Sequence, residues 1–356
     1  MSGTGRPVLL ERRGRLGVIT LNRPRAINAL THEMVRLVLR ALDEWEDDAT
    51  VHTVAVTGAG ERGLCAGGDV VALYEAAVRG PLEPAVEFWA EEYTMNARIA
   101  AYPKPVVAVQ DGLVLGGGIG ISSHASHRVV TERSRLGFPE VTIGFVPDVG
   151  GTWLLSRAPG ELGTRLALTG ASVGAADAIH VGLADHLVPS RSVPELLARL
   201  ETADPDPVVA ALAQDPGPAP LATERELTDH AFAADSVVAI LAALDADGGP
   251  TARELATTIR AKSPTALSVT LAALRRARGL GSLEEALAQE FRVSTRHLTA
   301  PDFVEGIRAQ LVDKDRTPRW RPARPEEVPP SLVEEFFRPP AWGELGSVRV
   351  TSKETS

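Results

Sequence analysis

In the first 190 residues of the chain, short apolar strand-like segments alternate with helix-like segments, and glycine-rich turns separate them. The strand-like segments cover residues 14–21, 51–56, 105–109 and 128–130. Apolar residues at helical spacing predict one helix that begins near Thr31, as its N-cap, and another over 84–100. Strands that alternate with helices indicate an α/β fold.

The composition changes after Leu187, and this change predicts the domain organisation. Residues 1–200 form the α/β core, and the Pro- and Asp-rich residues 201–223 are expected to be a linker or a loosely packed insertion. Residues 224–345 have a helical pattern throughout, including Ser263 before Pro264 as an N-cap. The tail over 346–356 has few apolar residues, and we expect it to be disordered.

Composition and charge exclude several classes of protein. Hydrophobic residues make up 44% and charged residues 23%, and the net charge of −9 argues against nucleic acid as a partner. No run approaches the ~18 apolar residues of a membrane span, and the N-terminus lacks the apolar segment of a signal peptide. The single cysteine, Cys65, cannot form an internal disulfide, which fits the reducing cytoplasm.

Several common motifs of catalysis and nucleotide binding are absent from the sequence. No glycine precedes a lysine, so there is no P-loop, and neither a Gly-x-Ser-x-Gly elbow nor a His-Glu-x-x-His zinc helix occurs. The glycines at 116–118 and 120 do not have the spacing of a dinucleotide-binding loop. The sequence therefore gives no support for a nicotinamide cofactor or a metal.

The two glycine clusters favour a different chemistry. Gly116–Gly118 follow one predicted strand and Gly67–Gly68 follow another, and each cluster precedes a helical segment. Backbone N–H groups at such a junction lack partners, and the missing Cβ atoms let an acyl group approach them. Two such donors that face one point would form an oxyanion hole. The alternative from the residues alone is that these glycines only form tight turns.

Two acidic residues stand in apolar surroundings within the segment FPEVTIGFVPDVGG. Glu140 and Asp148 each follow a proline, and a carboxyl group in such surroundings can act as a base or nucleophile. The alternative is helix N-capping, which is the more frequent role of an acid after proline. We interpret His124 and His127 as packing or surface residues, and Cys65 as a small buried residue.

Several segments together resemble a known family. LNRPRAINAL, LCAGGD, PKPVVAVQDGLVLGGGIG and GFPEVTIGFVPDVGG are similar to the crotonase (enoyl-CoA hydratase/isomerase) superfamily. FWAEEYTMN, SPTALSVTL and DFVEGIRAQLVDKDRTPRWRPA resemble its 3-hydroxyisobutyryl-CoA hydrolase branch. The resemblance extends over about residues 7–337, and the order and combination of the segments make it specific.

The resemblance implies an α/β fold with a crotonase-like spiral core of repeated ββα units. It also implies a helical C-terminal region that trimerises or folds over its own core, so a homo-oligomer remains open. The substrates would be CoA thioesters, with no metal and no cofactor apart from the CoA of the substrate. The site positions that the resemblance transfers are the oxyanion-hole glycines Gly68 and Gly117, the catalytic acids Glu140 and Asp148, and the substrate-binding residues Glu92, Gly67, Asp69 and Ala26.

One position favours the hydrolase branch over the hydratases that the chain resembles. Those hydratases carry a glutamate two residues after the glycine triplet, paired with the acid at the Pro-Glu segment, and this chain has Gly120 there. The sequence therefore predicts hydrolysis of a short β-hydroxyacyl-CoA, with valine catabolism as the pathway that the resemblance implies. Enoyl-CoA hydration or isomerisation is the alternative reaction, and a non-catalytic CoA-ester sensor is the alternative class.

Overall fold

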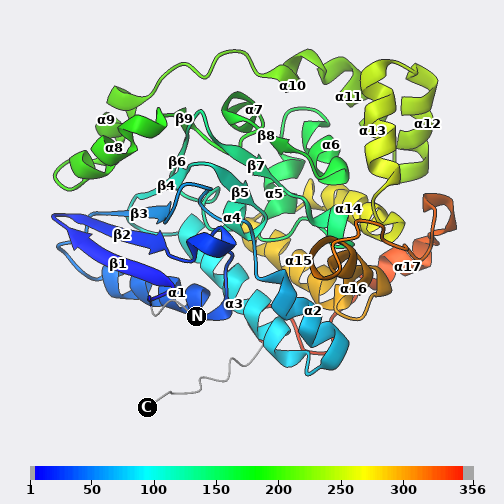
Figure 1. The fold of residues 1–356 in the computed structure, drawn as a ribbon, viewed down its shortest axis with the longest axis horizontal. Coiled ribbons are helices and arrows are strands. Elements are labelled where there is room, and N and C mark those ends of the chain that lie inside the picture. Colours follow the sequence, from blue (N-terminus) through cyan, green and yellow to red (C-terminus); the bar gives the residue numbers. More distant parts are fainter. Residues whose placement is uncertain (1–4, 348–356) are drawn as a thin grey trace.

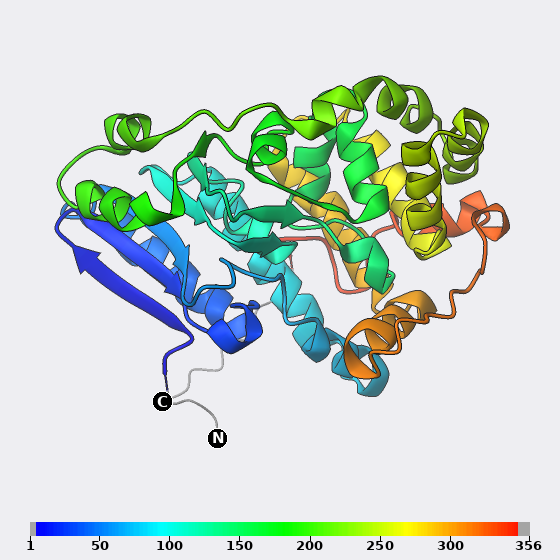
Figure 2. The same ribbon diagram turned by 45° about the horizontal axis from the view of Figure 1, so that its top comes forward.

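The computed structural model describes residues 5–347, with two β-sheets toward one side of this part of the chain and the helices of the C-terminal region toward the other (Figures 1 and 2). The larger sheet has the strand order β1-β2-β3-β4-β6-β9, and the smaller one has the order β5-β7-β8. The strands are β1 (Val8–Arg13), β2 (Leu16–Leu21), β3 (Thr53–Gly58), β4 (Val106–Gln110), β5 (Leu113–Leu115), β6 (His127–Val130), β7 (Arg135–Gly137), β8 (Ser172–Val173) and β9 (His186–Leu187). From β2 to β9 the larger sheet is parallel, and β1 is antiparallel to β2.

The chain passes from the larger sheet to the smaller one and then into a helix, three times in succession. After β3, Cys65 forms a parallel bridge with Val114 of β5, and α2 (Val70–Arg79) and α3 (Glu83–Ala100) follow. The next turn runs through β4, β5 and α4 (Gly117–Gly120), and the third through β6, β7 and the 3-10 helix η2 (Glu140–Ile143). This is the predicted spiral of ββα units, and the α/β fold class is confirmed.

The sequence patterns located most of the core elements correctly. The helix predicted near Thr31 is α1 (His32–Glu46), and the Thr31 side chain accepts a hydrogen bond from the Met34 N–H as an N-cap. Four predicted strands correspond to β2, β3, β4 and β6. The edge strand β1 has no counterpart among the predicted strands, because most of its side chains are exposed and it lacks a buried face.

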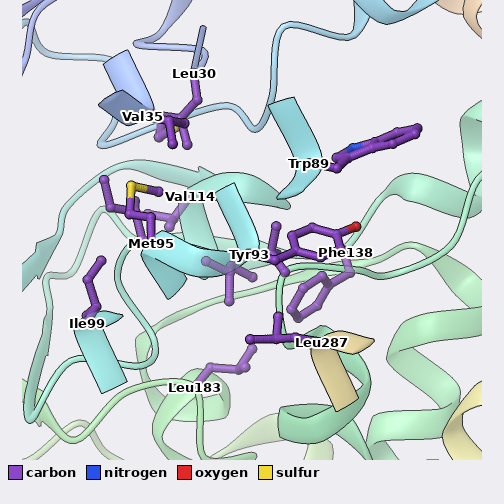
Figure 3. Close-up of a cluster of buried hydrophobic side chains, with 14 of the residues drawn as sticks. Leu30, Val35, Trp89, Tyr93, Met95, Ile99, Val114, Phe138, Leu183 and Leu287 are labelled. Atoms are coloured by element: carbon purple, nitrogen blue, oxygen red, sulfur yellow. The ribbon is translucent and has the colours of Figure 1, made fainter. Parts of the chain in front are cut away.

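Helix α3 lies at the centre of the main hydrophobic core. Figure 3 shows Trp89, Tyr93, Met95 and Ile99 of this helix between residues of α1 and residues of later elements. The helix is buried around most of its circumference, which keeps its polar residues Glu91, Glu92 and Asn96 away from bulk water. Helices α8 (Val193–Leu200) and α9 (Pro205–Leu212) cover the opposite face of the larger sheet.

The C-terminal region is helical, as expected, and it folds over the core of its own chain. Its helices are α11 (Arg225–Phe232), α12 (Val237–Asp247), α13 (Pro250–Arg260), α14 (Pro264–Ala277), α15 (Leu283–His297), α16 (Pro301–Ile307), the π-helical turn η4 (Arg308–Val312) and α17 (Pro330–Glu335). Helix α15 packs against α3 and α5 (Gly151–Ser156), and α16 packs against α2. Ser263 caps α14 as predicted, because its Oγ accepts from the Ala266 N–H.

Two segments differ from the pattern that the sequence suggested. Residues 201–223 contain α9 and the short helix α10 (Pro220–Thr223), and Val208 and Val209 of α9 are buried in the core. Residues 313–329 are not helical apart from the 3-10 turn η5 (Pro325–Glu327), since this stretch is rich in proline and has few apolar residues.

Other elements complete the described chain. They are η1 (Pro24–Ala26), α6 (Leu162–Thr169), α7 (Ala175–His180) and η3 (Ser190–Ser192). Most of the tail predicted over 346–356 lies outside the described residues. None of the helices within 5–347 is long and apolar enough to cross a membrane.

Candidate active site

A cavity of about 240 Å³ opens where the helices of the three spiral turns meet the C-terminal region. It lies between the two glycine clusters, α2, α3, η2, α16 and η4. Its lining residues are Ala66, Gly67, Gly68, Val70, Leu73, Phe88, Trp89, Glu92, Gly116, Gly117, Pro139, Glu140, Thr142, Ile143, Phe145, Asp148, Val149, Phe303, Gln310 and Leu311. The cavity thus combines an apolar wall with three carboxyl groups.

The two glycine clusters meet at this cavity, and each brings a free backbone donor. A Cβ atom on Gly117 would lie 3.2 Å from the backbone nitrogen of Gly68, so the two amides are close neighbours. Within the described chain, the N–H groups of Gly68 and Gly117 donate to no other group. Gly67 and Gly116 have φ values of +109° and +46°, and these turns direct the following amides into the cavity. The arrangement is that of an oxyanion hole.

Three carboxyl groups, those of Glu92, Glu140 and Asp148, lie around the paired amides and are between 2% and 7% exposed. A Cβ on Gly116 would lie 2.4 Å from Oε1 of Glu140, and one on Gly117 would lie 2.6 Å from Oε1 of Glu92. Among the described residues, Oε2 of Glu140 and Oε1 of Glu92 are buried without a hydrogen-bond partner. Burying an oxygen without a hydrogen-bond partner is energetically costly. Unpartnered buried oxygens of this kind are typical of sites where a ligand binds or a reaction takes place.

The helix-capping alternative does not describe Glu140 or Asp148. The Glu140 side chain makes no cap hydrogen bond at the start of η2. The Asp148 carboxylate accepts a hydrogen bond from the Tyr93 hydroxyl at 2.7 Å, and not from a helix terminus. Both acids are therefore held at the cavity and not used as caps.

Burial raises the pKa of all three acids, and the charge of Asp148 adds to this rise at Glu140 and Glu92. Burial raises the pKa of Glu140 well above the ordinary glutamate range, and the charge of Asp148 raises it further. Burial and then the charge of Asp148 likewise raise the pKa of Glu92. Burial raises the pKa of Asp148 to about 7, against the hydrogen bond from Tyr93, which lowers it. A carboxyl group whose pKa is raised in this way binds a proton more readily than an exposed one, as a general base must.

Asp148 is positioned by a hydrogen-bonded chain that begins on the C-terminal helix α15. The Tyr93 hydroxyl has one proton and donates it to Asp148, so the Ser294 hydroxyl, 2.7 Å away, donates to the Tyr93 oxygen. Tyr93 and Ser294 are both fully buried. These two hydrogen bonds hold the Asp148 carboxylate in one orientation.

The loop after Asp148 is strained and is held in place by two further side chains, those of His124 and Glu290. Val149 has a φ of +54°, an unfavourable conformation for a β-branched residue. Its carbonyl accepts from Nε2 of His124 at 2.8 Å, and burial lowers the pKa of His124 to about 4, which keeps the ring neutral. Glu290 of α15 accepts from the N–H groups of Gly150 and Thr152 at 2.6 and 2.8 Å. These contacts stabilise the strained turn that presents Asp148.

Gly120 has no room for a second acid. A Cβ at this position would lie 2.6 Å from the Cβ of Val149 and 2.9 Å from Nδ2 of Asn96. Both neighbours are buried, and Val149 belongs to the strained loop. A glutamate at position 120 is therefore incompatible with this packing.

The structure brings most of the predicted site residues together, but not all of them. Gly67, Gly68, Glu92, Gly117, Glu140 and Asp148 line the one cavity. Asp69 lies outside the cavity lining, where its carboxylate pairs with Arg23 at 3.2 Å, and Ala26 ends the short turn η1. Cys65 is buried and its pKa is raised by burial to about 12, which agrees with a structural role.

Sequence reasoning missed the residues that position the acids: Tyr93, His124, Glu290 and Ser294. His124, for which the sequence predicts a packing or surface role, is partly buried and in addition donates a hydrogen bond to the Val149 carbonyl. Only the adjacency of Tyr93 to Glu92 could have drawn attention to one of them. Within residues 5–347, no group of three or more His, Cys, Asp or Glu side chains has a geometry that could hold a metal ion.

The family model and the curated relatives that match this chain indicate the same family. The family model described as enoyl-CoA hydratase/isomerase matches residues 16–337. The Danio rerio protein named mitochondrial 3-hydroxyisobutyryl-CoA hydrolase is 39% identical, and the match covers 94% of this chain and 90% of that protein. The Homo sapiens protein of the same name is 36% identical, with coverage of 93% and 88%.

Two solved structures are similar over nearly their whole length. One, described as a carnitinyl-CoA dehydratase from Mycobacterium thermoresistibile, is 50% identical with a TM-score of 0.92 and covers 95% of this chain and 98% of that one. The other, described as an enoyl-CoA hydratase from Rhodobacter sphaeroides, is 42% identical with a TM-score of 0.89 and coverage of 96% and 99%. The names of the relatives thus divide between hydrolysis and the addition or removal of water at a double bond.

Proposed function

Because the chain belongs to the enoyl-CoA hydratase/isomerase family, we propose that it hydrolyses a short 3-hydroxyacyl-CoA of the 3-hydroxyisobutyryl-CoA type to the free acid and CoA. The observation that carries this proposal is the pair of free amides of Gly68 and Gly117 beside Glu140, with no space for a second acid at Gly120. Hydrolysis needs an oxyanion hole and one base or nucleophile, and the cavity contains both.

The mechanism begins with the thioester carbonyl oxygen between the amides of Gly68 and Gly117. These donors stabilise the negative charge that develops on the oxygen, by about 3 kcal/mol for each donor in comparable sites. They are fixed by the backbone, so they need no rearrangement as the charge forms. The carbonyl carbon then lies next to the Glu140 carboxylate.

Glu140 carries the reaction by one of two routes. As a nucleophile, its carboxylate attacks the carbonyl carbon, the CoA thiolate leaves, and water hydrolyses the resulting mixed anhydride. As a general base, it takes a proton from a water molecule that attacks the carbonyl carbon directly. Both routes consume one water molecule and yield the acid and CoA.

Asp148 and Glu92 are assigned to the acyl group. Asp148, oriented by Tyr93, would accept a hydrogen bond from the 3-hydroxyl of the substrate, and Glu92 would contact the substrate beside Gly117. These contacts would place the carbonyl between the amides and so lower the entropic part of the barrier.

Hydration of an enoyl-CoA is the second candidate function, because the two similar solved structures carry the names of a dehydratase and a hydratase. Hydration moves a proton and a hydroxyl across a double bond, and the resembling hydratases use two acids for it. The packing of Val149 and Asn96 around Gly120 disfavours this function.

The experiment that tests the proposal measures free thiol released from a panel of acyl-CoA esters with and without a 3-hydroxyl group. We expect the fastest release from 3-hydroxyisobutyryl-CoA and little conversion of crotonyl-CoA to 3-hydroxybutyryl-CoA. Rapid hydration of crotonyl-CoA without thiol release would favour the second candidate.

Asp148→Asn should lower kcat/KM for 3-hydroxyisobutyryl-CoA by about tenfold to a hundredfold, since a charged acceptor of the hydroxyl is lost. Isobutyryl-CoA, which lacks the hydroxyl, should be affected much less. Thiol release from the two esters measures the difference. If both esters lose activity equally, Asp148 acts on the reacting carbonyl and not on specificity.

The acid limb of the kcat/KM profile should lie above the pH range of an exposed glutamate. Glu140 works in its ionised form, and its pKa is raised by burial and by Asp148, so activity falls as pH falls through that raised pKa. Removing the nearby charge in Asp148→Asn eases ionisation of Glu140, which moves the acid limb to lower pH. A limb that stays in place would show that another group controls it.

We propose that the protein is cytoplasmic, because its single cysteine cannot form an internal disulfide. The curated relatives above are named as mitochondrial. A role in valine catabolism would follow if 3-hydroxyisobutyryl-CoA is the preferred ester. Sedimentation or light scattering of the purified chain measures whether it forms the homo-oligomer that the resemblance allows.

A further inference from the structure

A second cavity, of about 180 Å³, lies beside the candidate active site, between the start of α1 and helices α2 and α3. We call it the side cavity, and its lining residues are Leu30, Thr31, His32, Asp69, Ala72, Leu73, Ala76, Pro84, Ala85 and Phe88. Only Leu73 and Phe88 among these also line the active-site cavity. The two cavities are therefore neighbours on either side of these two side chains.

Phe88 stands directly at the oxyanion hole. Its Cζ would lie 3.4 Å from a Cβ on Gly68, so the ring covers the residue whose amide faces the thioester. On its other side the ring meets His32 edge-on, with the ring centres 6.0 Å apart, and Nε2 of His32 lies 2.9 Å from Oε2 of Glu91. The Phe88 ring thus packs against His32 of α1, and the hydrogen bond to Glu91 holds His32 in place.

The polar side chains of the side cavity are already occupied. Thr31 accepts a hydrogen bond from the Met34 N–H, Asp69 pairs with Arg23, and His32 pairs with Glu91. The remaining lining is aliphatic or aromatic, so the cavity offers apolar contact and no free polar group from these residues. An occupant would have to be a hydrocarbon chain.

We propose that Phe88 and Leu73 form a partition that limits the acyl group to a short chain, and that the side cavity is an extension of the acyl site from which this partition separates it. The inference rests on the proposed hydrolase function, and its occupant is the tail of a longer 3-hydroxyacyl-CoA. An acyl chain that starts at the thioester beside Gly68 meets Phe88 first. Without the ring, the chain continues into the side cavity.

The test compares 3-hydroxybutyryl-CoA with 3-hydroxyoctanoyl-CoA in the full-length protein and its variants. Phe88→Ala should raise the ratio of kcat/KM for the longer over the shorter ester by about tenfold or more, since added methylenes find an apolar space. Leu73→Ala opens the same partition from α2 with a smaller loss of volume, so it serves if Phe88→Ala fails to fold. An unchanged ratio in a folded variant would overturn the proposal.

A matched variant closes the side cavity again. Ala76 lines the side cavity and not the active-site cavity, and it is only partly buried. Ala76→Leu added to Phe88→Ala should remove the gain for the longer ester. A gain that persists in this double variant would contradict the assignment of the tail to the side cavity.

A binding measurement separates this inference from the proposed function. Non-hydrolysable thioether analogues with four- and eight-carbon chains can be titrated calorimetrically against the same variants. Phe88→Ala should tighten binding of the longer analogue relative to the shorter one, whether or not the protein hydrolyses thioesters. Absence of hydrolysis by the unmodified chain would end the proposed function alone, whereas an unchanged preference for chain length would end the partition alone.

Discussion

Glu140→Gln should lower the release of CoA from 3-hydroxyisobutyryl-CoA by about 10³-fold or more. The amide has nearly the same shape as the carboxylate, but it can neither attack the carbonyl carbon nor take a proton from water. Since the Glu140 side chain is buried and lines the cavity without capping a helix, the fold has no need of its charge. Binding of the CoA ester should therefore survive.

Two measurements check this prediction. Thiol release under single-turnover conditions reports the chemical step, and calorimetric titration with a thioether analogue reports binding. Glu161→Gln is a suitable control, because Glu161 is also a buried glutamate, but it pairs with Arg275 and Arg278 outside the cavity. Near-normal turnover in Glu140→Gln would remove Glu140 from the mechanism.

Gly117→Ala is the second change with a large expected effect, a loss of about 10²- to 10³-fold in kcat. The added Cβ would lie 2.6 Å from Oε1 of Glu92 and 3.2 Å from the Gly68 nitrogen, in the space that the thioester oxygen needs. The N–H groups stay in the chain, but the oxygen can no longer reach both of them. A loss of kcat would therefore result from the blocked position of the thioester oxygen, because both N–H donors are still present.

Two other glycine substitutions calibrate this result. Gly68→Ala adds a Cβ that meets only the Phe88 ring, at 3.4 Å, so we expect a much smaller loss of kcat. Gly279→Ala lies outside the cavity, with its nearest contact at 3.6 Å, and should leave kcat unchanged. Equal losses in Gly68→Ala and Gly117→Ala would mean that backbone distortion, and not the oxyanion position, controls the rate.

The sequence was sufficient to single out the glycine clusters and the acids that the fold brings to one cavity. The glycine clusters and the two acids each lie in short contiguous motifs, next to strands and helices whose apolar spacing is clear. Motif and element together fix the direction of a backbone amide such as that of Gly117. The role of Glu140 could be predicted only through resemblance, because a Pro-Glu pair is more often a helix cap.

The residues that hold the acids could not be predicted in the same way. Tyr93 and Ser294 are separated by 201 positions, and Glu290 lies 138 positions from Thr152. Their contacts exist only because α15 folds back onto α3 and α5, and no local pattern encodes that packing. A serine or glutamate on an amphipathic helix looks like any polar surface residue until its partner is known.

The packing around Gly120, which bears on the choice between hydrolysis and hydration, could not be predicted from the sequence either. The sequence shows that Gly120 is not an acid, but it does not show that an acid would fail to fit. That conclusion needs the left-handed turn at Val149 and the buried amide of Asn96, which together fill the space beside Gly120. The packing of a loop 29 positions away thus reinforces what a single glycine suggested.

The most direct test of the account is a crystal structure of the Glu140→Gln protein with intact 3-hydroxyisobutyryl-CoA. The proposed mechanism places the thioester oxygen about 3 Å from the nitrogens of both Gly68 and Gly117. It also places the side chain at position 140 beside the carbonyl carbon, and the 3-hydroxyl on Asp148. A thioester oxygen away from the two amides, or a side chain at position 140 turned toward bulk water, would contradict it.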